Sequence, residues 1–146
     1  MGNIFLIYEN GRKIWEVFYM NYEVKTNKTF EEAVESLKSS LADVSFGVLW
    51  ELNFKDKLEE KGYDFDTNFK VFEVCNPKQA KEVLEAHIEV GYFLPCKVVV
   101  YEKDGTTRIG MPKPTQLLGM MGRDDLMSVA EKVEGELKKA IDNAAR

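Results

Sequence analysis

Period-two alternation of apolar and polar residues predicts several strands along the chain. The segments with this pattern, or filled by β-branched and aromatic residues, are 22–24, 48–54, 69–75 and 96–101. A further strand at 106–111 follows Asp104-Gly105, a dipeptide that tolerates the positive φ angles of a two-residue hairpin turn. Pro112 and Pro114 stop this strand, because proline has no N–H to donate to a sheet. We therefore expect an antiparallel hairpin near the middle of the second half of the chain.

Apolar residues spaced by three and four predict helices between these strands. The expected helices are 29–43, a short charged helix that ends at Gly62, 77–87, and a long closing helix whose apolar stripe runs from 126 to 144. Thr29 and Glu32 form a capping box at the start of the first helix. Asn76 and Pro77 supply an N-cap acceptor and a proline at the first helical position. The order of elements predicts an α+β protein.

The first nineteen residues have a hairpin pattern of their own. Two apolar stretches, 4–8 and 14–19, flank Asn10-Gly11, a dipeptide typical of tight hairpin turns. We expect residues 1–19 to form an N-terminal β-hairpin extension and 20–146 to form a single α+β domain.

Composition and charge narrow the class of protein. The chain has 146 residues, of which 45% are hydrophobic and 31% are charged, as expected for one globular domain. No apolar run approaches the ~18 residues of a membrane span, so we expect a cytoplasmic protein without a membrane partner. With 20 Lys and Arg against 25 Asp and Glu, the net charge of −5 argues against nucleic acid as the partner.

Four short segments carry a resemblance to a known family. They are FGVLWE at 46–51, EVCNP at 73–77, LPCKV at 94–98 and GMPKP at 110–114. In this order they resemble the family catalogued as domain of unknown function 302, over residues 20–145. The resemblance implies a two-layer α+β fold like the half-domain of the TATA-binding protein, a curved and mainly antiparallel sheet with helices on one face. It also implies a homodimer, no established activity, and no counterpart of the first nineteen residues.

The candidate site depends on how the two cysteine segments pair. An antiparallel arrangement of the strand that ends at Cys75 and the one that begins at Cys96 brings both thiols to one end of the sheet. A parallel crossover separates them by ~20 Å; the family resemblance favours the antiparallel arrangement. Extending the register of the hairpin places Cys96 opposite Lys113 and Val98 opposite Met111.

These residues suggest a site for a small or thiophilic ligand. Cys75 lies just before a helix N-terminus, where the helix dipole and a nearby Lys113 favour a thiolate. Cys75 and Cys96 are soft donors and, with Met111 beside them, suit Cu(I), haem iron or another thiophilic group. Asn76 is positioned to hold a polar part of such a ligand. The cofactor itself is not identified by the sequence.

Two other classes of function stay open. The first is a thiol redox or thiol-nucleophile enzyme that uses Cys75 with Cys96 as resolving partner, which requires a lowered thiol pKa. The second is an interaction protein without chemistry, whose aromatic residues, including Trp15 and Phe18, bind a partner. In that case each cysteine is simply a small buried hydrophobe.

The remaining candidate residues favour structural roles. His87 is the only histidine and falls at a helix C-terminus, where its ring meets the carbonyl ends. Asp64 and Asp66 supply too few ligands for calcium or magnesium and are typical of a solvated turn. Met120 and Met121 suit core or dimer packing. The sequence contains no glycine-rich phosphate loop, dinucleotide fingerprint or G-x-S-x-G segment.

Overall fold

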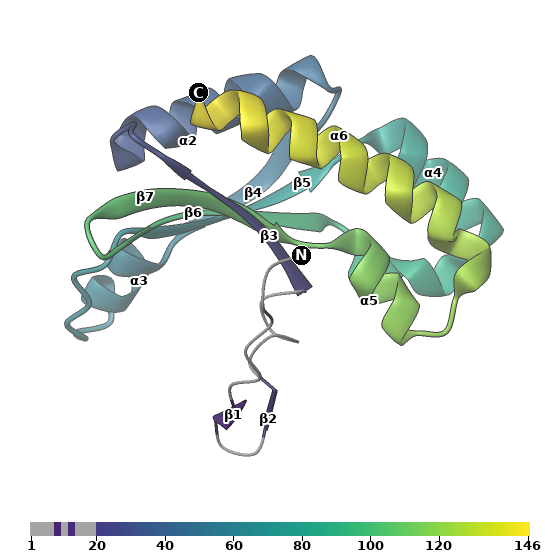
Figure 1. Ribbon diagram of the computed structural model, residues 1–146, viewed down its shortest axis with the longest axis horizontal. Coiled ribbons are helices and arrows are strands. Elements are labelled where there is room, and N and C mark those ends of the chain that lie inside the picture. Colours follow the sequence, from purple (N-terminus) through teal and green to yellow (C-terminus); the bar gives the residue numbers. More distant parts are fainter. Residues whose placement is uncertain (1–7, 10–11, 14–19) are drawn as a thin grey trace.

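A five-stranded antiparallel sheet forms the base of the molecule. The computed structural model describes residues 8–9, 12–13 and 20–146. Within 20–146 the strands are β3 (Asn21–Thr26), β4 (Gly47–Asn53), β5 (Phe69–Cys75), β6 (Cys96–Lys103) and β7 (Thr106–Pro112). They are arranged in the order β3-β7-β6-β5-β4, and every neighbouring pair is antiparallel. The curved sheet confirms the predicted mainly antiparallel architecture (Figure 1).

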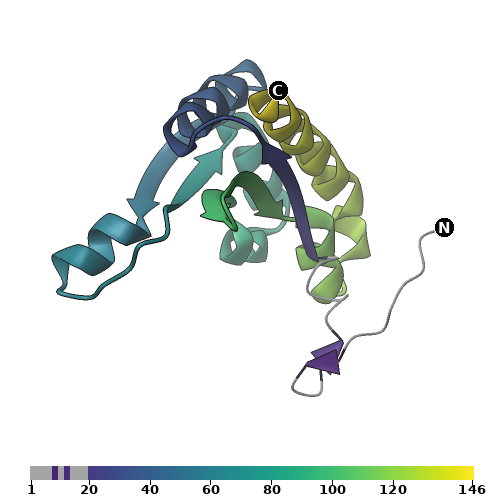
Figure 2. The ribbon, with the colours of Figure 1, turned by 60° about the vertical axis from the view of Figure 1, so that its left-hand side comes forward.

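Two long helices, α2 (Phe30–Asp43) and α6 (Met127–Ala145), lie side by side across one face of the sheet (Figures 1 and 2). Their apolar faces and the alternate strand residues below them form the main core, which includes Leu37, Phe72, Val98, Ile109 and Ile141, all fully buried. The molecule therefore has the two-layer α+β fold expected from the sequence.

The shorter helices gather at the edges of the two layers. They are α3 (Phe54–Glu60), α4 (Pro77–Ala86), η1 (Ile88–Phe93), α5 (Pro114–Met120) and η2 (Asp124–Leu126). A second, smaller core of Val90, Leu118, Leu126 and Ala130 joins η1, α5, η2 and α6. Among the described helices, none is long and apolar enough to cross a membrane.

Local sequence signals explain several element boundaries. The Thr29 side chain accepts from the Glu32 N–H and the Glu32 carboxylate accepts from the Thr29 N–H, which confirms the capping box. Between β6 and β7, Asp104 and Gly105 have φ angles of 54° and 74°, as the predicted two-residue turn requires. Gly62 follows α3 with a φ of 87°, a conformation that favours glycine.

Three differences from the expected elements have local causes. Phe54 begins α3 instead of ending β4, because the Asn53 side chain caps the helix by accepting from the Asp56 N–H. Pro114 does not only stop a strand: as the first residue of α5 it loses no helical hydrogen bond. The turns η1 and η2 were not expected, because both are too short to show a helical period.

The N-terminal segment is described only in part. Tyr8–Glu9 (β1) pairs in antiparallel fashion with Arg12–Lys13 (β2), on either side of positions 10 and 11. The rest of the predicted hairpin, including Trp15 and Phe18, lies outside the described residues.

Candidate functional site

The two cysteine segments meet at one end of the sheet. Strands β5 and β6 are antiparallel, and Val74 is the register partner of Cys96. Because Cys75 is the last residue of β5 and Cys96 the first of β6, both lie at the same sheet end. The antiparallel arrangement expected from the resemblance is confirmed, and the parallel crossover is not formed.

The same register separates the two side chains. Register partners in an antiparallel pair project from the same face, and successive residues of a strand project from opposite faces. Val74 and Cys96 therefore share the helix-covered face, where Val74 is fully buried and Cys96 packs against the core. Cys75 leaves the sheet on the other side, and both cysteines are free. The two thiols are neighbours in the fold without facing one another.

The surroundings of the thiols do not favour thiolates. Burial raises the pKa of Cys96 to about 11, with a further upward contribution from the charges of Cys75 and Glu73. Burial also raises the pKa of Cys75. The lowered pKa expected for Cys75 at the start of a helix is therefore wrong, because burial disfavours the charged thiolate.

The expected register pairs of Cys96 and Val98 with β7 are not formed. The ladder between β6 and β7 ends at the pair Val99–Gly110, so Cys96 and Lys113 are not paired. The Lys113 N–H donates instead to the Met20 carbonyl at 2.7 Å, on the β3 side of the chain. Met111 is 2% exposed and belongs to the main core. The register prediction therefore holds from Lys103–Thr106 to Val99–Gly110, but the predicted pairs Val98–Met111 and Cys96–Lys113 are not formed.

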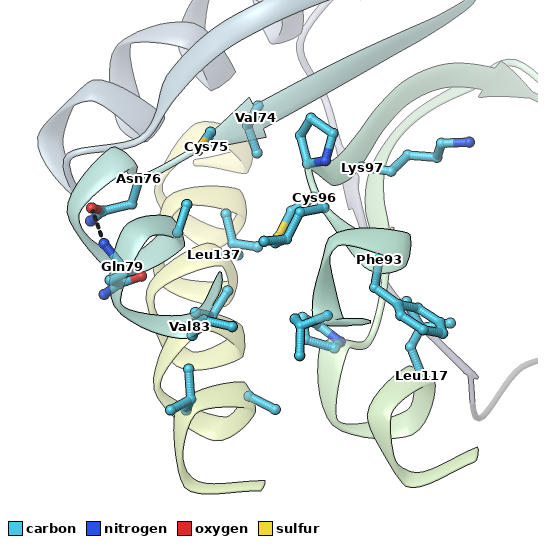
Figure 3. Close-up of a pocket in the computed structure, with 18 of the residues that line it drawn as sticks. Val74, Cys75, Asn76, Gln79, Val83, Phe93, Cys96, Lys97, Leu117 and Leu137 are labelled. Atoms are coloured by element: carbon cyan, nitrogen blue, oxygen red, sulfur yellow. Dashed lines mark hydrogen bonds between the residues drawn. The ribbon is translucent and has the colours of Figure 1, made fainter. Parts of the chain in front are cut away.

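A cavity of about 450 Å³ lies at this end of the molecule. It lies between α4, η1, α5 and α6, beside the end of β5 and the start of β6 (Figure 3). Its walls are mostly apolar, and the helices and turns contribute Val83, Val90, Phe93, Leu117, Leu118, Leu126, Val129, Ala130, Val133 and Leu137. Cys75, Asn76 and Cys96 line it, whereas Met111 and Lys113 are not among the lining residues.

Polar groups of the cavity gather where β5 leads into α4. The Asn76 side chain caps α4 by accepting from the Gln79 N–H at 3.2 Å. The Gln79 side chain donates through Nε2 to the Glu136 carboxylate on α6 at 3.0 Å. Lys97 also lines the cavity, but its ammonium group extends away from it (Figure 3). The cavity therefore has an apolar body and one polar end formed by Asn76, Gln79 and Cys96.

Sequence reasoning missed several walls of this cavity. The apolar spacing of 77–87 predicted the helix but not a cavity beside it, and Leu117 was missed because no helix was expected at 114–120. Gln79 stands three residues after the N-cap Asn76, where a capping box would bring its side chain back to the Asn76 N–H, but the side chain donates to Glu136 instead. His87 is the C-cap of α4, as expected from its position, and contacts Arg123 and Asp125.

Metal-binding groups are sparse in the described part of the chain. No cluster of three or more His, Cys, Asp or Glu side chains is positioned to hold a metal ion among residues 8–9, 12–13 and 20–146. Asp64 and Asp66 are exposed in the loop between α3 and β5. A metal held at this sheet end would have to use one or both cysteines with ligands from elsewhere.

Comparison with known proteins identifies relatives of this fold. The family model described as domain of unknown function DUF302 matches residues 22–144. The crystal structure of an uncharacterized conserved DUF302 protein from Bacillus stearothermophilus is 46% identical, with a TM-score of 0.83 over 87% of this chain and 98% of that one. No curated protein is significantly similar. The family match and the shared fold together show that this chain belongs to the DUF302 family.

Proposed function

We propose that this protein binds a small, mainly apolar ligand in the cavity between α4, α5, η1 and α6. The observation that carries the proposal is the cavity itself. Protein interiors are close-packed, with few voids larger than a water molecule. A space of about 450 Å³ with mostly apolar walls falls instead within the range of roughly 300–1,000 Å³ typical of ligand pockets.

The lining supports a ligand with an apolar body and a single polar end. The ammonium of Lys97 points away from the cavity, Glu73 is the register partner of Lys97 and projects from the same outer face of the sheet, and the carboxylate of Glu136 is already bonded to Gln79. A charged ligand group would therefore lose its hydration without gaining an opposite charge, which is costly in an apolar site. A hydroxyl, amide or heteroaromatic N–H placed near Asn76, Gln79 and Cys96 fits this chemistry.

The thiols favour binding over nucleophilic chemistry. A thiol enzyme needs an appreciable thiolate fraction near neutral pH, and the pKa of each cysteine is raised. A thiophilic ligand is also compatible with the site. In the cavity it would contact mainly the Cys96 thiol, because the Cys75 side chain projects from the other side of the sheet.

Thermal unfolding in the presence of uncharged apolar compounds tests the proposal. A ligand at 100 times its Kd stabilises the folded state by about 2.7 kcal/mol, which raises Tm by roughly 5–10 °C for a chain of this size. Val133→Trp fills the cavity from α6 and should abolish the shift, whereas Lys132→Trp on the exposed side of the same helix should keep it. Equal shifts in both variants would place binding elsewhere.

We also propose that two copies form a homodimer through the edge strand β4. β4 is at the end of the strand order, and its Leu49 and Trp50 are 60% and 52% exposed. An exposed apolar edge strand favours pairing with another chain. Size-exclusion chromatography with light scattering should give twice the monomer mass, and Trp50→Lys should shift it to the monomer. A monomeric wild-type protein would refute this proposal without affecting ligand binding.

A further inference from the structure

A proline interrupts the ladder between two inner strands of the sheet. The last register pair of β6 and β7 is Val99–Gly110, and two residues further along each strand stand Lys97 and Pro112. Because proline has no N–H, Pro112 cannot donate to the Lys97 carbonyl. Proline is normally restricted to edge strands, strand starts or bulges, yet β7 lies between β3 and β6. The sheet therefore leaves one backbone acceptor of β6 without its donor.

The neighbouring hydrogen bonds show that this acceptor points toward β7. The backbone groups of successive strand residues point alternately to the two neighbouring strands. The Glu102 N–H donates toward the β5 side, to the Asn68 carbonyl at 3.0 Å, so the backbone groups of Lys97 point the other way, toward β7. Just after β7, the Lys113 N–H donates to the Met20 carbonyl on the β3 side at 2.7 Å, so position 112 faces β6. The unpaired carbonyl and the proline nitrogen thus face one another.

This acceptor lies in the wall of the cavity. Lys97 and Pro112 both line the cavity, together with Cys96. The ammonium group of Lys97 extends away from it (Figure 3), so Lys97 borders the cavity with its backbone side. Among the described residues, no loop or turn N–H donates to the Lys97 carbonyl. The polar end of the cavity therefore includes a backbone oxygen beside Cys96.

A ligand that fills the cavity changes the surroundings of this oxygen. In the free protein, water supplies a donor to such a carbonyl. An entirely apolar ligand would displace that water, and a buried acceptor without a partner is unfavourable by about the free energy of one hydrogen bond. We propose that the ligand is an uncharged, mainly apolar molecule whose N–H donates to the Lys97 carbonyl, in place of the ladder bond that Pro112 cannot form. The inference rests on the proposed function, because it names the polar group of the ligand for the same cavity.

Indole and benzofuran test the proposal, because these uncharged rings have nearly the same shape and only indole has an N–H. Calorimetric titration of the full chain should show that indole binds about 3- to 10-fold more tightly, as expected for one hydrogen bond. A cavity without an acceptor would reverse this order, because the indole N–H would lose its bond to water. Val133→Trp, which fills the cavity, should bind neither compound.

Two proline substitutions separate the acceptor from the rest of the wall. Pro112→Ala supplies the N–H that completes the pair with Lys97, so the preference for indole should fall below about twofold. Pro114→Ala is the matched control, because it removes the same ring from another lining residue. Its new N–H lies at the first position of α5, where an N–H has no partner within the helix. This control should keep the preference of the wild type.

The carbonyl-carbon NMR resonance of Lys97 gives a direct reading in the wild-type protein. It should move downfield on saturation with indole and much less with benzofuran, because only indole donates a hydrogen bond. This measurement needs no substitution, so it remains decisive if Pro112→Ala fails to fold.

Three results would overturn the inference alone. They are equal binding of the two compounds to the wild type, an unchanged preference for indole in folded Pro112→Ala, and equal movement of the Lys97 resonance with both compounds. Failure of indole, benzofuran and other apolar compounds to bind at all would instead refute the proposed function, and the inference with it.

Discussion

At the scale of single residues, position in the ladder decides the chemistry of the two cysteines. The sequence could predict that Cys75 and Cys96 lie at one sheet end, because the segments EVCNP and LPCKV resemble a family with an antiparallel sheet. The sequence could not predict how deeply the two thiols are buried. The raised thiol pKa values depend on burial, and Cys96 packs against the main core, to which α2 and α6 contribute from distant parts of the chain.

The raised pKa of Cys96 predicts a loss of stability at alkaline pH. Because its folded-state pKa is about 11 and its ordinary value is 9.0, the thiol contributes its full stabilisation below pH 9. This contribution is lost as the pH rises from 9 toward 11, since the unfolded chain ionises first. Between pH 8 and 10.5, wild type should lose about 2 kcal/mol more unfolding free energy than Cys96→Ala. Urea unfolding at both pH values measures this difference. Equal losses of unfolding free energy in wild type and Cys96→Ala would contradict the burial of the Cys96 thiol.

Glu134 is a buried carboxylate that stabilises the neighbouring helix. It is 8% exposed, accepts from the Thr115 N–H at 3.2 Å and from Thr115 Oγ1 at 2.8 Å, and pairs with Lys138 at 3.3 Å. Glu134, which belongs to α6, thereby caps the N-terminus of α5. Glu134→Ala should lower the free energy of unfolding by about 1–3 kcal/mol, whereas Glu131→Ala, on the exposed side of α6, should change it by less than about 0.5 kcal/mol. Equal small effects would refute the capping role.

At the scale of elements, prediction succeeded where a segment carries its own signal. The strand at 69–75 has the expected bounds, and the helix that begins at Pro77 ends one residue earlier than expected, with His87 as its C-cap. Prediction failed for elements whose formation depends on contacts with distant parts of the chain. α5 is seven residues long and has no side-chain cap of its own, and Glu134 of α6 supplies the missing acceptor. No pattern within 114–120 contains that information.

The contact of β3 with β7 depends on one glycine. A Cβ at Gly110 would lie 2.9 Å from the Tyr22 carbonyl oxygen, so the two strands would have to separate. Gly110→Ala should destabilise the protein by about 1–3 kcal/mol.

Gly135→Ala is the matched control for this substitution. Its Cβ meets nothing within 4 Å, and Gly135 lies inside α6, so alanine should stabilise the helix by up to about 1 kcal/mol. The two substitutions should therefore change the midpoint of urea unfolding in opposite directions. A neutral Gly110→Ala would show that β3 and β7 do not approach as closely as described.

At the scale of the whole molecule, the sequence predicted the layers but not the space between them. Helix periods and strand alternation predicted the elements, and the resemblance to the DUF302 family supplied the curved antiparallel sheet with helices on one face. The cavity lies where α4, η1, α5 and α6 meet beside the end of β5 and the start of β6, and side chains from all of these elements line it. A volume left by incomplete packing has no signature in any single segment.

The most direct test of the ligand-binding cavity is a fluorescence titration with N-phenyl-1-naphthylamine, an uncharged aromatic probe. We predict saturable binding of one probe per chain to the wild-type protein and to Lys132→Trp. The cavity-filling variant Val133→Trp, folded to a similar stability, should not bind it. Absence of saturable binding to the wild type, or equal binding to Val133→Trp, would contradict the account.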